Sequence, residues 1–395
     1  MSKTGTGRSV NAAVAAQSPP MHAHRGIAAP VVRLALLGTG TVGSAVTARL
    51  AVLAGSSLGA RLSLVHAANS RHAISGRFGV VADISVLQLA SNAQASELSG
   101  VAPALGSDGT RVVIDATASE DVAARHAQWL RQGIHVVTAC KLGQGTSLAR
   151  WRAIRAACNE AGTHYGDSAT VGAGLPLLRT IRELRAGGDR IHAIAGVLSG
   201  SLAWLCNHYD GLRAFSGFVR EARAAGYTEP DPREDLSGED VRRKLLILAR
   251  AAGVEMEADA VEVASLVPAQ LAQLQRDEVD AALPALDAPL RERYAAAYKN
   301  GEKLRFIARL EHSADGIAKA RVGLESLAGD HPLAGGAGTD NRVAIWSDRY
   351  CTQPLVIQGP GAGAQVTAAA LLDDVLGIAA RAVQACASSE SIAAA

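Results

Sequence analysis

The pattern of apolar positions in the first half of the chain predicts alternating strands and helices. Residues 31–37 form a nearly continuous apolar run, as expected of a strand buried in a parallel sheet. An apolar, alanine-rich helix is predicted to follow at about 42–53. The next segments are strands at 62–67 and 112–114, a helix at 121–131 and a strand at 135–138. This alternation predicts a doubly wound parallel sheet.

The pattern changes after about residue 170, where helices mix with strands predicted at 192–198, 304–310 and 318–324. A glycine-rich run at 359–363 then precedes an apolar helix at 366–382, and residues 388–395 are expected to fray. We therefore predict an α/β chain with a second, α+β domain. Its predicted parts are a disordered tail at 1–29, a nucleotide-binding domain at 30–168, the α+β domain at 169–358 and a C-terminal segment at 359–395 that returns to the nucleotide domain.

Composition narrows the class of protein. The 39 Lys and Arg nearly balance the 37 Asp and Glu, which argues against a nucleic-acid binder with a broad basic face. No apolar run is long enough to span a bilayer. The five scattered cysteines fit reduced thiols and a cytoplasmic location. Residues 1–29 contain no acidic residue, which fits a disordered tail and, more weakly, a transit peptide.

A glycine motif marks a candidate nucleotide site between the first strand and the first helix. Gly38, Gly40 and Gly43 have the spacing G-x-G-x-x-G, with Thr41 and Val42 between the last two. These glycines permit a tight turn, close approach of a pyrophosphate and close packing of helix on strand. The helix N-terminus offers unpaired N–H groups to phosphates. The motif predicts a Rossmann-type domain; the alternative is a glycine-rich turn without a ligand.

The end of the second predicted strand indicates which nucleotide is bound. NAD enzymes usually place an acid there for the ribose 2′-hydroxyl, but no Asp or Glu occurs between Gly43 and Asp83. The strand instead runs into Asn69, Ser70 and Arg71. A guanidinium suits a 2′-phosphate, so this segment predicts NADP(H). The alternative is that Arg71 is a solvated loop residue.

An acidic, proline-stiffened segment carries the candidate catalytic chemistry. Residues 226–235 are rich in acids and run into a predicted helix on which Asp240 and Lys244, four apart, share a face. Reduction of an aldehyde needs a cation or proton donor at the carbonyl oxygen, and an amino-acid substrate needs carboxylates for its ammonium group. The alternative is structural: Ser237 with Asp240 fits a capping box, and Asp240 with Lys244 fits a surface pair.

Residues 226–250 (GYTEPDPREDLSGEDVRRKLLILAR) resemble the signature of homoserine dehydrogenases. Residues 133–141, 169–176, 196–202, 359–363 and 366–369 are similar to the family too, so the resemblance covers about 31–380. It implies an NADP(H)-dependent oxidoreductase that interconverts L-aspartate 4-semialdehyde and L-homoserine in threonine, methionine and isoleucine biosynthesis. It also implies a cytoplasmic homodimer that binds its substrate and dimerises through the α+β domain. The chain is most similar to the dehydrogenase half of the bifunctional aspartate kinase enzymes, without room for the kinase or a regulatory domain.

The resemblance assigns roles to individual residues. It makes Lys244 the chief candidate for proton transfer and places Lys141 between nicotinamide and substrate. The alternative for Lys141 is an ordinary surface lysine at the end of a strand. Glu229 and Asp240 would bind the substrate amino group, and Asp235 would orient a water or a neighbour. Gly200 and Ser201 would contact the substrate. The full set predicted to bind the cofactor is Gly38, Gly40, Thr41, Val42, Gly43, Asn69, Ser70, Arg71, Thr117, Lys141 and Gly363.

Two positions depart from the family. Cys140 replaces the asparagine that usually precedes the lysine, which leaves the local hydrogen bonding open. Ser168, with Asp167 beside it, stands where the family often has a glutamate that helps bind sodium. The backbone carbonyls of Val171, Ala173 and Leu175 are the predicted ligands if a structural sodium ion is present.

Two other functions compete with that of a homoserine dehydrogenase. Another Rossmann dehydrogenase would share the glycine loop but would not explain the cluster from Glu229 to Lys244. A non-catalytic NADP-binding regulator would have no need of Lys141 and Lys244 beside matching acids.

Overall fold

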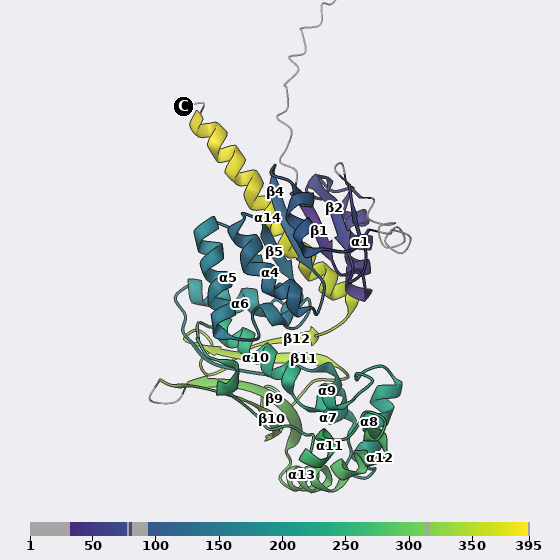
Figure 1. The fold of residues 1–395 in the computed structure, drawn as a ribbon. Helices are drawn as coiled ribbons and strands as arrows, with labels where there is room; N and C mark the ends of the chain where they lie inside the picture. The colour runs from purple at the N-terminus through teal and green to yellow at the C-terminus, as the bar shows by residue number, and fades with distance from the viewer. Residues whose placement is uncertain (1–31, 77–78, 81–93, 313–315, 394–395) are drawn as a thin grey trace, which may run out of the picture.

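The computed structural model describes residues 32–76, 79–80, 94–312 and 316–393. The predicted tail at 1–29 lies outside these ranges. Within them the strands form two sheets, one above the other in Figure 1. The strands are β1 Val32–Leu37, β2 Leu62–Ala68, β3 Ala73–Ser75, β4 Thr110–Asp115, β5 His135–Thr138, β6 Tyr165–Gly166, β7 Ile191–Val197, β8 Val261–Val263, β9 Lys303–His312, β10 Ala318–Leu327, β11 Asp340–Ser347 and β12 Leu355–Pro360.

Helices cover these sheets and connect their strands. One turn of 3-10 helix, at Lys141–Gly143, follows β5. The α-helices are α1 Thr41–Leu53, α3 Val101–Leu105, α4 Glu120–Arg131, α5 Leu148–Ala161, α6 Leu177–Ala186, α7 Gly200–His208, α8 Phe215–Ala224, α9 Arg233–Leu236, α10 Glu239–Ala251, α11 Ala269–Ala272, α12 Val279–Ala282, α13 Asp287–Lys299 and α14 Ala364–Ala393.

The first sheet has the order β3-β2-β1-β4-β5-β6 and is parallel except for the β2–β3 pair. Its apolar strands are buried on both faces, because alternate side chains of β1 enter different cores. Leu34 and Leu36 pack with α1 and α14, whereas Ala35 and Leu37 pack with α3, α4 and α5. The order places β1 and β4 side by side, so a nucleotide at the glycine loop lies near the carboxyl ends of β4 and β5.

The second sheet is mixed, with the order β12-β11-β7-β9-β10-β8 and one parallel pair, β8 with β10. One face packs against the largest core, which includes α6, α7, α8 and α10. Two six-stranded sheets of these kinds confirm the predicted fold class. The exact domain boundaries stay a prediction.

The C-terminal helix differs from the expectation. α14 packs on α1 and the first sheet and continues to Ala393, although fraying was expected from residue 388 (Figure 1). No Gly or Pro follows residue 382, and the alanines there favour helix. In the described part of the chain, none of the helices is both long and apolar enough to cross a membrane.

Candidate active site

A cleft of about 770 Å³ lies between loops of the first sheet and residues that precede and begin α10. The loops after β4 and β5 form one wall, and the segment from Glu229 through the start of α10 forms the other. Of the predicted site residues, it is lined by Thr117, Lys141, Glu229, Asp235 and Asp240. Residues predicted to bind cofactor and residues predicted to bind substrate therefore share one cavity, although they come from segments about 100 positions apart.

Asp240 joins two lysines at this cleft. Its Oδ2 atom lies 2.8 Å from the Lys244 Nζ atom, and its Oδ1 atom lies 3.3 Å from the Lys141 Nζ atom. Lys244 is one helical turn along α10, so the first contact follows from helix geometry. Lys141 arrives from the other domain, at the 3-10 turn after β5. One carboxylate thus holds two ammonium groups beside the cleft.

Burial and the neighbouring charges shift the pKa values of Lys244 and Asp240 in opposite directions. Burial lowers the pKa of the Lys244 ammonium, and Asp240 partly restores it. Burial also acts to raise the pKa of Asp240, but Lys244 and Lys141 together hold that pKa well below its usual range. Asp240 therefore stays ionised at neutral pH, and Lys244 has a lowered pKa, as a proton-transfer group requires.

The exposure of Lys244 argues against an ordinary surface pair. Its side chain is only 12% exposed, and its Nζ atom also donates a hydrogen bond of 2.8 Å to the carbonyl oxygen of Leu198. That carbonyl lies at the end of β7, just before α7. The ammonium is therefore fixed from two elements, whereas exposed helical pairs are weakly held.

The capping-box alternative is wrong for this helix. The N-cap of α10 is Gly238, with φ of 78°, and no side chain caps it. Ser237 instead accepts a hydrogen bond of 3.2 Å from the Glu239 N–H. A Cβ atom at position 238 would lie 3.0 Å from the ring of Phe306, so both the backbone angle and the packing require glycine there. Asp240 is thereby left to contact the lysines.

Asp235 lines the cleft and joins two neighbouring segments through its carboxylate. Its Oδ1 atom accepts a hydrogen bond of 2.6 Å from the Ser201 hydroxyl, and its Oδ2 atom accepts one of 2.8 Å from the Glu229 N–H. Ser201 Oγ lies 2.9 Å from Ser199 Oγ. Glu229 is exposed, and Gly200 opens α7 with a Cβ position only 3.2 Å from the Thr339 carbonyl. The predicted residues 200, 201, 229 and 235 are thus brought together.

The glycine loop fits a dinucleotide. A Cβ atom at Gly40 would meet nothing within 4 Å, so this residue faces open space at the start of α1. A Cβ atom at Gly43 would lie 1.9 Å from the Gly38 carbonyl oxygen, and Gly38 has φ of 91°. No side chain caps α1, which leaves its first N–H groups, at Thr41 and Val42, for a phosphate.

The end of β2 is compatible with the predicted 2′-phosphate contact. Asn69 Oδ1 accepts hydrogen bonds from the N–H groups of Arg71 and His72, at 2.8 and 2.7 Å, and so shapes this turn. Ser70 and Arg71 are exposed. Gly363, with φ of 123°, directly precedes α14, the helix that packs against α1.

The polar side chains beside the turn predicted to hold sodium already have protein partners. Asp167 is bound by both terminal nitrogens of Arg182, at 2.7 and 2.6 Å, and Ser168 donates to Asp374. Among the three predicted carbonyls, that of Leu175 already accepts a hydrogen bond from the Leu177 N–H. In the described ranges no group of three or more His, Cys, Asp or Glu gathers as metal ligands. The predicted contacts of Val171, Ala173 and Leu175 stay a prediction, and we derive no step from them.

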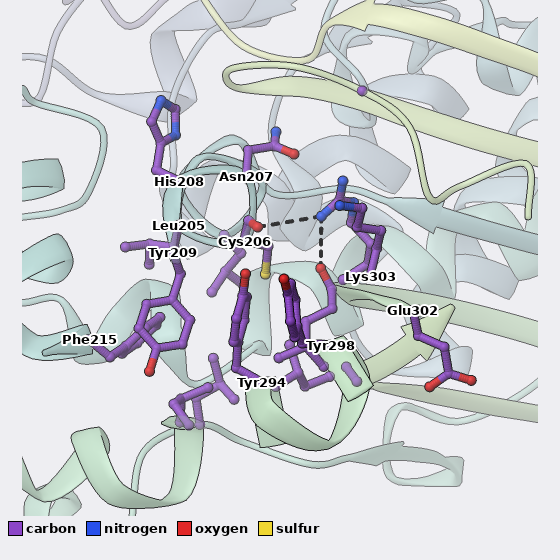
Figure 2. A pocket seen from close by; sticks show the side chains of 18 of the residues that line it. Leu205, Cys206, Asn207, His208, Tyr209, Phe215, Tyr294, Tyr298, Glu302 and Lys303 are labelled. Carbon is purple, nitrogen blue, oxygen red and sulfur yellow. Dashed lines mark hydrogen bonds between the residues drawn. The ribbon is translucent and has the colours of Figure 1, made fainter. Parts of the chain in front are cut away.

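A second cavity, of about 430 Å³, lies between α7, α13 and β9 (Figure 2). Tyr294 and Tyr298 stack within it, beside Cys206 and Asn207. It contains none of the predicted site residues. The larger cleft at Lys141 is therefore the candidate active site.

Sequence reasoning missed two polar residues of this region. Ser199 lines the cleft, and buried Asp115 ends β4 directly beneath it. A polar residue at the carboxyl end of a parallel strand is a signal that the sequence does carry for Asp115. Its partners come from β5 and α4, so its role is visible only in three dimensions.

Two family models match the chain. The homoserine dehydrogenase model matches residues 176–376, and the model for the NAD-binding domain of homoserine dehydrogenase matches residues 38–166. Together they span both walls of the cleft.

Curated relatives agree with these models. The chain is 43% identical to a bifunctional aspartokinase/homoserine dehydrogenase of Zea mays over 68% of its own length, but it spans only 29% of that protein. It is 36% identical to the homoserine dehydrogenase of Saccharomyces cerevisiae, with 89% of this chain and 99% of the yeast protein covered.

Solved structures show the same fold. A Candida auris protein of unknown function superposes with a TM-score of 0.82 at 33% identity, with 89% of this chain and 99% of that chain covered. A hyperthermophilic archaeal homoserine dehydrogenase in complex with NADPH has a TM-score of 0.67 at 20% identity, with 87% and 96% covered. The models, the identity to the yeast enzyme and the shared fold lead to one conclusion: the chain belongs to the homoserine dehydrogenase family of NAD(P)-dependent oxidoreductases.

Proposed function

We propose that the chain catalyses the reversible reduction of L-aspartate 4-semialdehyde to L-homoserine with NADPH, a step of threonine, methionine and isoleucine biosynthesis. The observation that carries this proposal is the trio of Asp240, Lys141 and Lys244 at a cleft shared with the nucleotide-binding domain. The names of the yeast and plant relatives and the NADPH complex of the archaeal one support the choice of substrate and cofactor.

NADPH, when bound at the glycine loop, supplies the hydride to the aldehyde carbon. The protein's own task is then to stabilise and protonate the carbonyl oxygen. Lys244 donates that proton, and Lys141 stabilises the developing negative charge. Asp240 keeps both ammonium groups at the cleft and, with the exposed carboxylate of Glu229, receives the substrate's ammonium group. Asp235 holds Ser201 and the Glu229 backbone in place.

The direct test follows the absorbance of NADPH with purified protein and aspartate 4-semialdehyde. Consumption of NADPH that depends on the semialdehyde is expected. Consumption with other aldehydes only would indicate a different Rossmann dehydrogenase. Binding of NADPH without turnover of any aldehyde would indicate the non-catalytic regulator, and either result would reject the proposal.

Cofactor choice yields a separate prediction. Replacing Arg71 by alanine is expected to lower kcat/KM for NADPH about tenfold and to leave kcat/KM for NADH nearly unchanged, because the guanidinium would bind the 2′-phosphate, which NADH lacks. Arg131→Ala is the matched control, since Arg131 is the exposed last residue of α4 and pairs with Glu160. A ratio of the two kcat/KM values that is unchanged in Arg71→Ala would make Arg71 a solvated loop residue.

The assembly and the location of the enzyme are further parts of the proposal. The family resemblance favours a homodimer, to be tested by light scattering against the chain's 40.6 kDa. Cys140, Cys158, Cys206 and Cys351 are unpaired in the described residues, which supports a reducing compartment such as the cytoplasm. Several plant relatives are named as chloroplastic.

A further inference from the structure

A buried carboxylate ties together the two loops that form the nucleotide side of the cleft. Asp115, at the carboxyl end of β4, is fully buried. Its Oδ1 atom accepts hydrogen bonds from the N–H and hydroxyl of Thr117, at 2.9 and 2.7 Å. Its Oδ2 atom accepts from the Thr138 hydroxyl at 2.9 Å and lies 3.0 Å from His126 Nε2. Thr117 lines the cleft, and Thr138 ends β5 just before Lys141.

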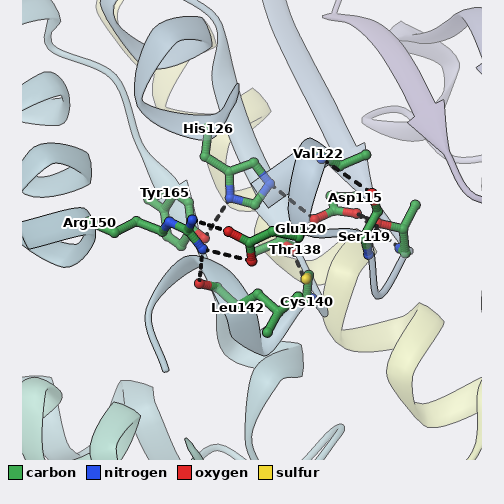
Figure 3. Close-up of polar contacts among 11 residues, drawn as sticks. Asp115, Ser119, Glu120, Val122, His126, Thr138, Cys140, Leu142, Arg150 and Tyr165 are labelled. Carbon is green, nitrogen blue, oxygen red and sulfur yellow. Dashed lines mark hydrogen bonds and ion pairs between the residues drawn. The ribbon is translucent and has the colours of Figure 1, made fainter. Parts of the chain in front are cut away.

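The network continues away from the cleft through His126 to Tyr165, as Figure 3 shows. The Tyr165 hydroxyl lies 2.9 Å from His126 Nδ1. Burial raises the pKa of Tyr165 well above its usual value, so the phenol keeps its proton and can donate it to Nδ1. With Nδ1 as the acceptor of that bond, Nε2 carries a hydrogen atom and donates it to Asp115. Four donors thus satisfy one buried carboxylate, which removes most of the cost of burying its charge.

The 3-10 turn that carries Lys141 rests on this network at two points and on a separate ion pair at a third. The Cys140 N–H donates to the Thr138 hydroxyl at 2.8 Å. A Cβ atom at Gly143 would lie 2.2 Å from the Tyr165 hydroxyl and 3.0 Å from His126 Nδ1, so the turn sits directly on both rings. The Leu142 carbonyl accepts a hydrogen bond of 3.0 Å from Arg150, which Glu120 holds by an ion pair (Figure 3).

Cys140 stands where the family usually has asparagine, and the structure shows what this replacement leaves in place. The backbone of residue 140 still binds the network through its N–H, while burial raises the pKa of its thiol to about 11. The thiol is therefore un-ionised at neutral pH and adds no charge beside Lys141. Support for the turn comes from Asp115, His126 and Tyr165.

We propose that Asp115, His126 and Tyr165 are positioning residues, which hold the turn at Lys141–Gly143 so that the Lys141 ammonium reaches Asp240 across the cleft. This inference deepens the proposed function and rests on it for its kinetic consequences. The alternative is that the three residues only fill the space between α4 and the first sheet. That alternative predicts lost stability and an undisturbed cleft.

The variants Tyr165→Phe and Asp115→Asn test the proposal. Tyr165→Phe removes one hydroxyl and keeps the ring, and we expect kcat for the semialdehyde to fall roughly tenfold, because an error of about 1 Å in a catalytic group costs up to about 10²-fold. Asp115→Asn should lower kcat further and also raise KM for NADPH, since it loosens Thr117. Tyr209→Phe, in the core of the other domain, is the matched control and should keep kcat.

A second readout does not depend on activity. Trace acetylation followed by mass spectrometry reports how firmly each lysine is held, and the Lys141 side chain is 31% exposed and thus reachable. Labelling of Lys141 is expected to rise about threefold or more in Tyr165→Phe, as the contact with Asp240 is lost, and labelling of exposed Lys299 should stay constant. If the wild type reduces no aldehyde, the proposed function fails, while the labelling still tests the positioning. Unchanged Lys141 labelling and kcat in a folded Tyr165→Phe protein, with only a lower Tm, would overturn the inference.

Discussion

Replacing Lys244 by methionine is expected to lower kcat for aspartate 4-semialdehyde about 10²–10⁴-fold, the usual contribution of a general acid. Methionine keeps the apolar stem in a site where the side chain is 12% exposed, so the fold should survive. The lost hydrogen bond to the Leu198 carbonyl should cost about 1 kcal/mol of stability. Steady-state kinetics and melting curves measure both effects, with KM for NADPH expected to stay nearly constant.

Two further variants make this measurement decisive. Lys299→Met, on the exposed end of α13, should change neither kcat nor Tm appreciably. Lys141→Met should lower kcat as well, because Lys141 shares the charge stabilisation. A folded Lys244→Met enzyme with near-normal kcat would transfer the role of proton donor to Lys141.

Local features of the sequence were sufficient to predict the nucleotide loop and much of α10. The spacing of Gly38, Gly40 and Gly43 fixes a turn that needs no distant partner. The four-residue spacing of Asp240 and Lys244 fixes their contact once the segment is helical. These predictions concern neighbours along the chain, for which the geometry of a single helix or turn is enough.

Contacts between distant segments could not be predicted in the same way. The contact of Lys141 with Asp240 joins residues 99 apart across two domains, and only the folded chain shows that one carboxylate serves both lysines. The structural alternative, a capping box of Ser237 with Asp240, rests on a serine three residues before an acid, which is a common helix cap. The left-handed conformation of Gly238 and the ring of Phe306 above it decide otherwise.

Asp240→Asn is expected to shift the pH dependence of the reaction as well as its rate. Burial lowers the pKa of Lys244 and Asp240 raises it, so loss of the negative charge should lower that pKa further. Reduction of the aldehyde needs the protonated amine and declines as pH rises through this pKa. The declining limb should therefore move to lower pH in the variant, by about one unit or more. Oxidation of homoserine needs the neutral amine, so its rising limb should move in the same direction.

Asp240 itself does not produce the limb in the wild type, because the two lysines keep the pKa of its carboxylate far below the assay range. KM for the semialdehyde should also rise about tenfold or more, since Asp240 is proposed to receive the substrate's ammonium group. Glu183→Gln is the matched control: Glu183 forms an exposed i,i+4 pair with Arg179 on α6, and its loss should change stability by less than about 0.5 kcal/mol. A different outcome is that the pH profiles of aldehyde reduction and of homoserine oxidation are the same in Asp240→Asn as in Glu183→Gln. In that case Asp240 and Lys244 form only a helical pair, and the cluster has no part in catalysis.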